Sequence, residues 1–341
     1  MDAALIWEWI IKSIILILVL LVGFAYTTYM ERKFLARFQD RYGPNRAGPL
    51  GLLQPIADAF KLIFKEELMP SQVDKVIFNL APILTAVPAW IILAVVPFGG
   101  TIHLFGRDIS LSLASNLDTG ILYISAIASI SVYGIVLAGW SSNNKYAMMG
   151  GMRSSAQMIS YELTLGLSWV GPILLASSMN IGKIVEAQAP MWFVVYQPLG
   201  FILFLIATLA EINRSPFDMP EAEQELTAGY HTEYSGMKFA LFMLTEYTKM
   251  IVVSVIGAAL FLGGYQGPFA AWIDWPIWMG PIFMFVKVFL LIFGIIWVRA
   301  TLPRFRYDRL MAFGWKILLP LALANALLTA ILIIVFPGLG K

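Results

Sequence analysis

Long runs of apolar residues recur through this sequence, and most charged residues lie in the shorter stretches between them. About 20 apolar residues in a helix span the hydrocarbon core of a bilayer. The strands of a membrane barrel would instead alternate apolar and polar positions, which these runs do not do. The pattern predicts an all-α polytopic membrane protein with eight transmembrane helices, at 9–30, 77–97, 119–140, 154–176, 191–211, 237–262, 277–298 and 315–336.

The positive charges are distributed unevenly between the two sets of loops. Together with Lys238, four loops hold 17 of the 23 Lys and Arg residues, whereas the loops opposite hold only Arg107 and Lys183. Lys and Arg favour the cytoplasmic side of a membrane. We therefore expect one membrane domain, 1–341, with both termini on the outer, periplasmic side and with cytoplasmic loops at 31–75, 141–153, 212–236 and 299–316.

One segment of the first cytoplasmic loop, 50–67, has the pattern of an amphipathic helix. Its polar side chains are spaced by four, three and four positions, at Gln54, Asp58, Lys61 and Lys65. Apolar side chains fill the other side, at Leu52, Leu53, Ile56, Phe60, Ile63 and Phe64. This segment is too short and too charged to span the bilayer, so it should lie along the interface with its apolar face buried.

Composition restricts the chemistry. Hydrophobic residues make up 59% of the chain and charged residues only 13%, against about 25% charged in soluble domains. With no cysteine, the chain cannot bind an iron–sulfur cluster through thiolates or use a thiol nucleophile. Its two histidines, His103 and His231, fall on opposite predicted sides, which argues against haem. No hydrolytic triad, phosphate-binding loop or zinc pattern is present, and nothing indicates nucleic-acid binding. The chemistry available is protonic and electrostatic.

Charged residues inside the predicted spans are the first candidate site. Glu162 lies about 12 Å along its helix from the cytoplasmic end, and Glu246 lies at a similar depth. Glu211 ends the fifth span, Lys249 follows Glu246 by three positions, and Lys287 is near the middle of the seventh span. Buried carboxylates can exchange protons as a coupled group. The alternative is structural: ion pairs between Lys249 and Glu246, and between Lys287 and one of the acids.

The stretch 210–234 is the second candidate, because it places many acids between two membrane-length segments. Arg214 is its only Lys or Arg. Six of the chain's 21 acidic residues lie here: Glu211, Asp218, Glu221, Glu223, Glu225 and Glu233. We expect His231, in the same loop, to be structural.

The residues of several loops together resemble one family. The motifs are Tyr-Met-Glu-Arg-Lys (29–33), Arg-Tyr-Gly-Pro-Asn-Arg-Ala-Gly-Pro-Leu-Gly (41–51) with the helix after it, Ala-Glu-Ile-Asn-Arg-Ser-Pro-Phe-Asp-Met-Pro-Glu-Ala-Glu (210–223), Gly-Tyr-His-Thr-Glu-Tyr-Ser-Gly (229–236), Thr-Glu-Tyr-Thr-Lys (245–249) and Pro-Arg-Phe-Arg-Tyr-Asp (303–308). Over nearly its full length the chain is similar to the H-subunit, also called subunit 1, of proton-translocating NADH:quinone oxidoreductase, respiratory complex I.

The resemblance implies roles for individual residues. Those expected along the quinone tunnel are Glu31, Arg32, Arg41, Asp58, Phe217 and Asp218. Those expected on the proton path are Glu162, Glu211, Glu221, Glu223, Glu225, Glu233 and Glu246. Supporting positions are Arg214, Tyr161, Tyr234, Tyr247 and Lys249.

The resemblance also implies the setting. The substrate would be a quinone, ubiquinone or menaquinone, while FMN and iron–sulfur clusters would belong to partner subunits only. Expected partners are the quinone-module subunits of the peripheral arm, the small membrane-arm subunits, the antiporter-like subunits and membrane lipid. The chain would be a subunit of a translocase in a bacterial cytoplasmic membrane, without catalytic residues or a metal of its own.

Other interpretations remain. Relatives of complex I that use ferredoxin or contain a hydrogenase share this fold. An ion-coupled secondary transporter would need inverted repeats, but the long loops 31–75 and 212–236 share no pattern. A purely structural anchor would leave Glu162 unexplained.

A cluster of mostly basic residues lies in the last cytoplasmic loop. We interpret it as a topology or docking signal: Arg299, Arg304, Arg306, Tyr307, Asp308 and Arg309.

Overall fold

The computed structural model of the chain describes residues 3–104, 107–114, 117–218, 229–268, 270–273 and 275–336. Within these ranges it is helical apart from one short hairpin, β1 (Thr101–Leu104) with β2 (Arg107–Ser110). The long helices are α1 (Ala3–Phe38), α3 (Lys75–Ile91), α4 (Gly120–Ser141), α5 (Lys145–Ala176), α10 (Gly236–Phe261), α11 (Gly280–Thr301) and α13 (Leu319–Val335). Shorter helices are α2 (Gln54–Phe64), α6 (Ile181–Ala187), α7 (Phe193–Tyr196), α8 (Pro198–Glu211) and α12 (Tyr307–Phe313).

The described helices confirm the prediction of a polytopic all-α protein. Seven are long and apolar enough to cross a membrane; α12 and α13, joined by the π-helical turn η5 (Gly314–Leu318), count as one of them. The eighth predicted span corresponds to α8, which is apolar but has only 14 residues. It is short because Gln197, whose backbone is not helical, separates it from α7, and because the helix ends at Glu211.

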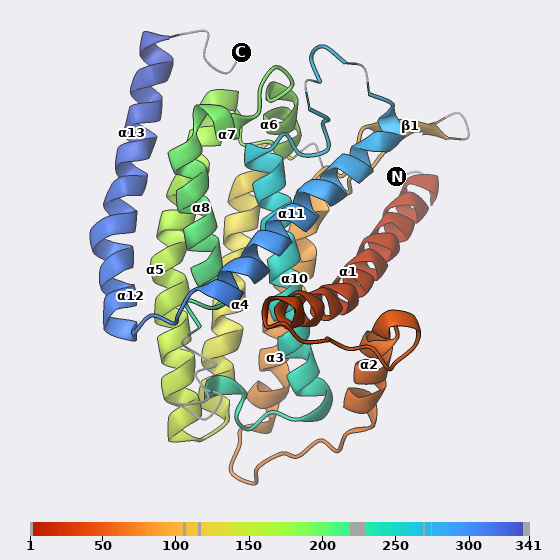
Figure 1. The fold of residues 1–341 in the computed structure, drawn as a ribbon, viewed down its shortest axis with the longest axis vertical. Helices are drawn as coiled ribbons and strands as arrows, with labels where there is room; N and C mark the ends of the chain where they lie inside the picture. The colour runs from red at the N-terminus through yellow and green to blue at the C-terminus, as the bar shows by residue number, and fades with distance from the viewer. Residues whose placement is uncertain are drawn as a thin grey trace.

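The start of α1 and the end of α13 both lie toward the upper end of the molecule, where β1 and α6 also lie (Figure 1). The α2 segment and the α4–α5 connection lie toward the other end (Figure 1). An even number of membrane crossings places both termini at the same end of the molecule. From here on, the end with β1 is called outer and the end with α2 inner, following the predicted orientation.

α5 is the central element of the bundle, packing against α4, α8 and α13, while α3 packs against α4 and α10. The close crossing of α4 and α5 depends on glycine: a Cβ on Gly139 would lie 2.6 Å from the carbonyl oxygen of Ala147. Small residues permit such approaches between membrane helices. The core contains large, fully buried side chains such as Tyr161, Phe204 and Phe261. α13 lies at one edge of the bundle, α1 is tilted at the opposite side, and α11 runs obliquely across the front (Figure 1).

The amphipathic segment forms the expected helix but ends earlier than predicted, because Lys65 is already extended. No residue of α2 is buried against the rest of the described chain, and Phe64 is 82% exposed. The apolar face that we expected to be buried is therefore not covered by the described part of this chain. It is available to lipid or to a neighbouring subunit.

Candidate functional site

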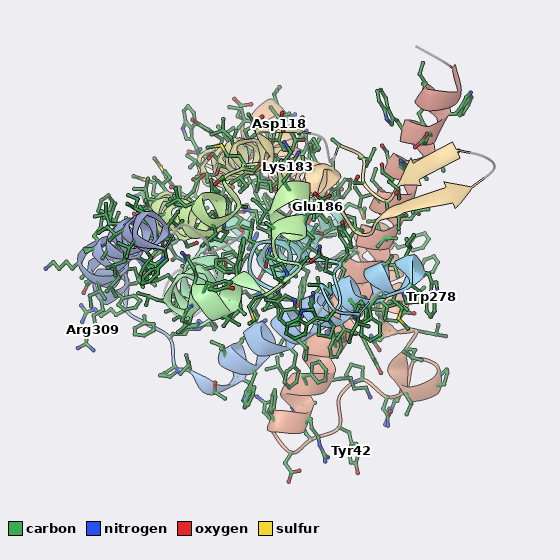
Figure 2. The ribbon with its side chains drawn as sticks, turned by 90° about the horizontal axis from the view of Figure 1, so that it is seen from above. Tyr42, Asp118, Lys183, Glu186, Trp278 and Arg309 are labelled. Carbon is green, nitrogen blue, oxygen red and sulfur yellow. The ribbon has the colours of Figure 1, made fainter. Side chains whose placement is uncertain are left out.

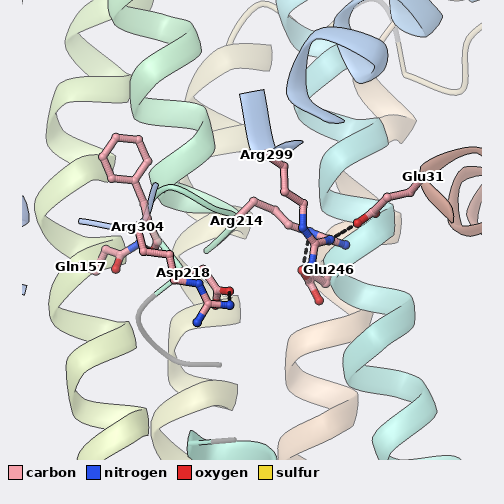
Figure 3. Close-up of polar contacts among 8 residues, drawn as sticks. Glu31, Gln157, Arg214, Asp218, Glu246, Arg299 and Arg304 are labelled. Atoms are coloured by element: carbon pink, nitrogen blue, oxygen red, sulfur yellow. Dashed lines mark hydrogen bonds and ion pairs between the residues drawn. The ribbon is translucent and has the colours of Figure 1, made fainter. Parts of the chain in front are cut away.

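Arg214 is the centre of the inner polar network (Figure 3). It follows the last turn of α8, and its side chain is only 4% exposed. Its Nη1 lies 2.9 Å from Glu31 Oε1 on α1, and its Nε lies 2.5 Å from Glu246 Oε1 on α10. The guanidinium also lies over the ring of Tyr247, 4.4 Å from its centroid. A buried charge destabilises the fold unless it is paired. The ion pairs of Arg214 therefore hold the loop after α8 against α1 and α10.

Arg299, at the inner end of α11, also pairs with Glu31. Two arginines and two glutamates, Arg214, Arg299, Glu31 and Glu246, thus form one cluster whose formal charges cancel (Figure 3). The interpretation of Arg299 as only a topology or docking residue missed this ion pair, because the partner lies 268 positions away in the sequence.

α5 holds the segment that carries Arg214. The side-chain amide of Gln157, fully buried, donates hydrogen bonds of 2.8 Å to the carbonyl oxygens of both Ala210 and Phe217. Asn213 adopts a left-handed conformation with φ 52°, and its amide donates to Ser154 Oγ at 3.1 Å. These bonds satisfy backbone groups that leave the α8 ladder, so the loop after α8 has a fixed path.

The predicted quinone residues Phe217 and Asp218 lie next to this network. Asp218, 3% exposed, pairs with Arg304 at 2.9 Å (Figure 3). The ring of Phe217 stacks on Phe305 with centroids 5.5 Å apart. Tyr161 lies against Phe217 and donates its hydroxyl to the Leu310 carbonyl at 2.9 Å. Arg304, like Arg299, therefore belongs to the site and not only to a docking surface.

The foot of α1 connects the network with α2. Glu31 points into the cluster, whereas its neighbour Arg32 pairs with Asp58 of α2 at 2.5 Å. Gln54 also donates to Asp58, at 3.3 Å. The structure does not bring Arg41 to these residues: its side chain is exposed and donates to Gln39, two positions away.

A second group of charged residues lies deeper in the bundle. Glu162 on α5 accepts a hydrogen bond from Ser129 of α4. Lys249 on α10 donates to Ser131 of α4 at 2.8 Å, and its charge interacts with both Glu211 and Glu162. Glu211 is 6% exposed, and its Oε2 has no hydrogen-bond partner among the residues described.

Two ion pairs expected in the structural alternative are wrong. Lys249 does not pair with Glu246, because Glu246 pairs with Arg214 from the loop. Lys287 pairs with no acid of the described residues: its ammonium donates to the backbone carbonyls of Gly264 at 2.9 Å and Gln266 at 2.6 Å. It also lies over the indole of Trp192, 4.6 Å from the centroid. Helical spacing suggested the first pair and the position of Lys287 inside a span suggested the second, but tertiary contacts with other groups are found instead.

Glu233 and Tyr234 belong to a third cluster, at the inner surface. Glu233 accepts from the Asn144 amide at 2.7 Å and borders a pocket of about 380 Å³ that Ser142 and Lys145 also line. Tyr234 stacks on Phe78 with centroids 4.0 Å apart, and burial raises its pKa to about 12. His231 packs among aromatic rings, and burial lowers its pKa to about 3, so it is neutral. Glu221, Glu223 and Glu225 lie outside the described residues.

Among the residues that the structure describes, no three His, Cys, Asp or Glu side chains gather closely enough to hold a metal ion. The site therefore offers arginines, carboxylates and hydroxyls. Such groups can bind a polar head group, stabilise a charge that forms on it, and exchange protons.

The family model for NADH dehydrogenase matches residues 11–330. The chain is also 51% identical over 333 residues to NADH-quinone oxidoreductase H-subunit 1 of Geobacter sulfurreducens, covering 94% of both chains. The chain belongs to the H-subunit family of NADH-quinone oxidoreductase. The H-subunit of Thermomicrobium roseum is 49% identical, with 95% of this chain and 97% of that protein covered. The H-subunit of Dehalococcoides mccartyi is 50% identical, with 95% and 88% covered.

Membership confirms the resemblance stated from the loops. An H-subunit is a multi-pass membrane subunit of a translocase whose substrate is a quinone, and its partners are the other subunits of that enzyme.

Proposed function

We propose that this chain forms, with partner subunits, the quinone-binding chamber of the enzyme and the first part of the path that couples quinone reduction to proton translocation. Its inner loops would face the cytoplasm of a bacterium and both termini the outer side, as the distribution of Lys and Arg predicts.

One observation carries the proposal: Arg214 pairs at the same time with Glu31 at the foot of α1 and with Glu246 on α10. Glu31 is the sequence neighbour of Arg32, which pairs with α2. Glu246 is one helical turn from Lys249, which interacts with Glu211 and Glu162. The arginine thus connects residues expected at the tunnel mouth with the acids inside the bundle.

This connection can transmit charge. Reducing a quinone by two electrons produces negative charge that must be neutralised by two protons, and the fields of such charges are strong where water is excluded. Because Arg214 is shared by two carboxylates, weakening its pairing with one strengthens its pairing with the other. Protonation of Glu31 or Glu246 therefore changes the electrostatic environment of its partner acid, as coupled titrating groups require.

The quinone would approach along α2. That helix leaves its apolar face uncovered, so an isoprenoid tail can lie against it. The pairs Arg32–Asp58 and Arg304–Asp218 would border the polar part of the path. Photoaffinity labelling of the assembled enzyme with a quinone analogue tests this placement: we expect adducts in 31–67 and 211–236, and adducts confined to other segments would contradict it.

The proton path is tested with Glu211→Gln, which replaces a buried ionisable side chain with one of similar shape that cannot exchange a proton in this way. We expect NADH oxidation by an artificial acceptor to remain normal, because that reaction needs only partner subunits, while quinone reduction and pumping are suppressed. Glu186→Gln is the matched control, since Glu186 is exposed on α6 at the outer end (Figure 2). Normal pumping by Glu211→Gln would refute this path.

A further inference from the structure

α4 supplies a hydroxyl group to Glu162, one of the acids of the proposed path. Ser129 lies on α4 at a half-buried position, and its Oγ lies within hydrogen-bonding range of two acceptors. One is the Glu162 carboxylate on α5, and the other is the carbonyl oxygen of Ser125, 3.0 Å away in the preceding turn of α4. A hydroxyl has one proton to donate and two lone pairs to accept with.

These two neighbours allow Ser129 to bond Glu162 in either protonation state. When Glu162 is ionised, the Ser129 O–H donates to the carboxylate, a charge-assisted bond. When Glu162 is protonated, its O–H donates to Ser129 Oγ, and the Ser129 proton turns to the Ser125 carbonyl. The serine gains and loses no proton in this exchange, and the hydrogen bond between Ser129 and Glu162 is kept in both states.

We propose that Ser129 is a positioning residue for proton transfer through Glu162, because it holds the carboxyl in place in both protonation states. This inference rests on the proposed proton path. It adds a residue outside the expected site, because a serine four positions after another, as Ser129 is after Ser125, is by itself typical of helix packing.

The surroundings of Glu162 favour this role over simple packing. The Glu162 side chain interacts electrostatically with Lys249, and Lys249 is itself held by a second hydroxyl of α4, that of Ser131, at 2.8 Å. Ser131 in turn donates to the Ala128 carbonyl at 2.8 Å. Ser129 and Ser131 are two positions apart and therefore point to different sides of α4. Through them, α4 contacts both Glu162 of α5 and Lys249 of α10.

The test uses the complete enzyme in membrane vesicles, with Ser129→Ala and Ser129→Thr. Alanine removes the hydroxyl, whereas threonine keeps it, and threonine commonly bonds the carbonyl of the preceding helical turn. We expect Ser129→Ala to lower NADH:quinone reductase activity and pumping about tenfold, as loss of a hydrogen bond to a charged group implies. Ser129→Thr should restore both to within about twofold of the natural enzyme.

The matched control is Ser254→Ala on α10. Ser254 is buried at 2% exposure, and its hydroxyl donates to the Met250 carbonyl at 2.8 Å, so it is a packed helix serine away from the acids. It should leave both activities unchanged. Infrared difference spectra provide a readout that packing would not change: the carboxyl band that Glu162→Gln abolishes should shift in Ser129→Ala and return in Ser129→Thr.

Three outcomes overturn the inference: normal turnover in Ser129→Ala, equal losses in the alanine and threonine variants, or an unmoved carboxyl band. Glu211→Gln, measured in parallel, separates the two proposals. If it blocks pumping while Ser129→Ala is normal, only the role of Ser129 fails. If Glu211→Gln pumps normally, the proposed path itself fails.

Discussion

The structure buries two cations toward opposite ends of the bundle, and their partners differ in kind. Arg214 at the inner end is 4% exposed and bonds two carboxylates, Glu31 and Glu246. Lys287, 7% exposed, bonds the carbonyls of Gly264 and Gln266 in the loop after α10. Carboxylates can take up protons, whereas backbone carbonyls cannot. On the proposed path we therefore expect charge to change during turnover at the inner end, while the contacts of Lys287 hold an outer loop.

The outer loop has further hydrogen bonds to backbone groups. The side chain of Gln188 accepts from the backbone N–H of Gly263 at 2.8 Å and donates to the Ala259 carbonyl at 2.8 Å. Both groups lie where α10 has ended or is ending, so a side-chain amide replaces the missing ladder bonds. Within the described residues, these two bonds join uncharged groups, so Gln188 holds this end of α10 without an ion pair.

The largest effect is expected for Arg214→Met, which removes the shared cation and leaves Glu31 and Glu246 buried with less compensation. Breaking a buried ion pair by removing one partner costs about 3–5 kcal/mol. We expect quinone reductase activity of the assembled enzyme to fall below detection. Arg214→Lys keeps the charge but cannot bond both acids in the same geometry, so it should retain part of the activity. Full activity in the methionine variant would remove the basis of the comparison.

Lys287→Met is the corresponding change at the outer end. It keeps the length and apolar character of the side chain and removes its bonds to two carbonyls, so we expect a loss of about 1–3 kcal/mol in stability. Thermal unfolding of the purified enzyme would show this as a lower midpoint. Quinone reductase activity per assembled complex should remain normal. A defect in pumping without a loss of stability would show that Lys287 does more than hold the loop.

The inner loop should also respond to pH through His231, whose pKa burial lowers from 6.5 to about 3. Below pH 6.5 the unfolded chain binds a proton that the folded chain excludes, so stability is lost as the pH falls from about 6.5 toward 3. For one such group the slope is about 1.4 kcal/mol per pH unit. Melting measurements at pH 7 and 5.5 should show this loss, and His231→Phe should reduce it. Equal losses in both proteins would place the titration elsewhere.

The sequence predicted the fold well because the length of an apolar run is a direct physical requirement for crossing a bilayer. Through motifs shared with the family it also named Glu31, Arg214 and Glu246, which the structure brings together, and Asp218, which lies next to them. It could not predict their partners, because Arg214 lies 183 positions from Glu31 and contacts it only in the folded chain. The expected pair of Lys249 with Glu246 was wrong for the same reason. Helical spacing makes such a pair possible, but an arginine from a loop already occupies that acid.

The smallest effect, and the sharpest comparison, concerns two ion pairs that are both accessible to solvent. Arg32–Asp58 at the inner end has side chains 50% and 31% exposed, and Lys183–Asp118 at the outer end has side chains 61% and 78% exposed. Exposed pairs contribute about 0–1 kcal/mol, so neither Arg32→Gln nor Lys183→Gln should shift the melting temperature appreciably.

Only the inner pair joins α1 to the helix along which the quinone would enter. We therefore expect Arg32→Gln to raise the KM for quinone about threefold, the equivalent of less than 1 kcal/mol. Lys183→Gln, on the face shown in Figure 2, should leave it unchanged. Steady-state kinetics over a range of quinone concentrations measures both, and equal KM values in the two variants would mean that the Arg32–Asp58 pair has no part in quinone entry.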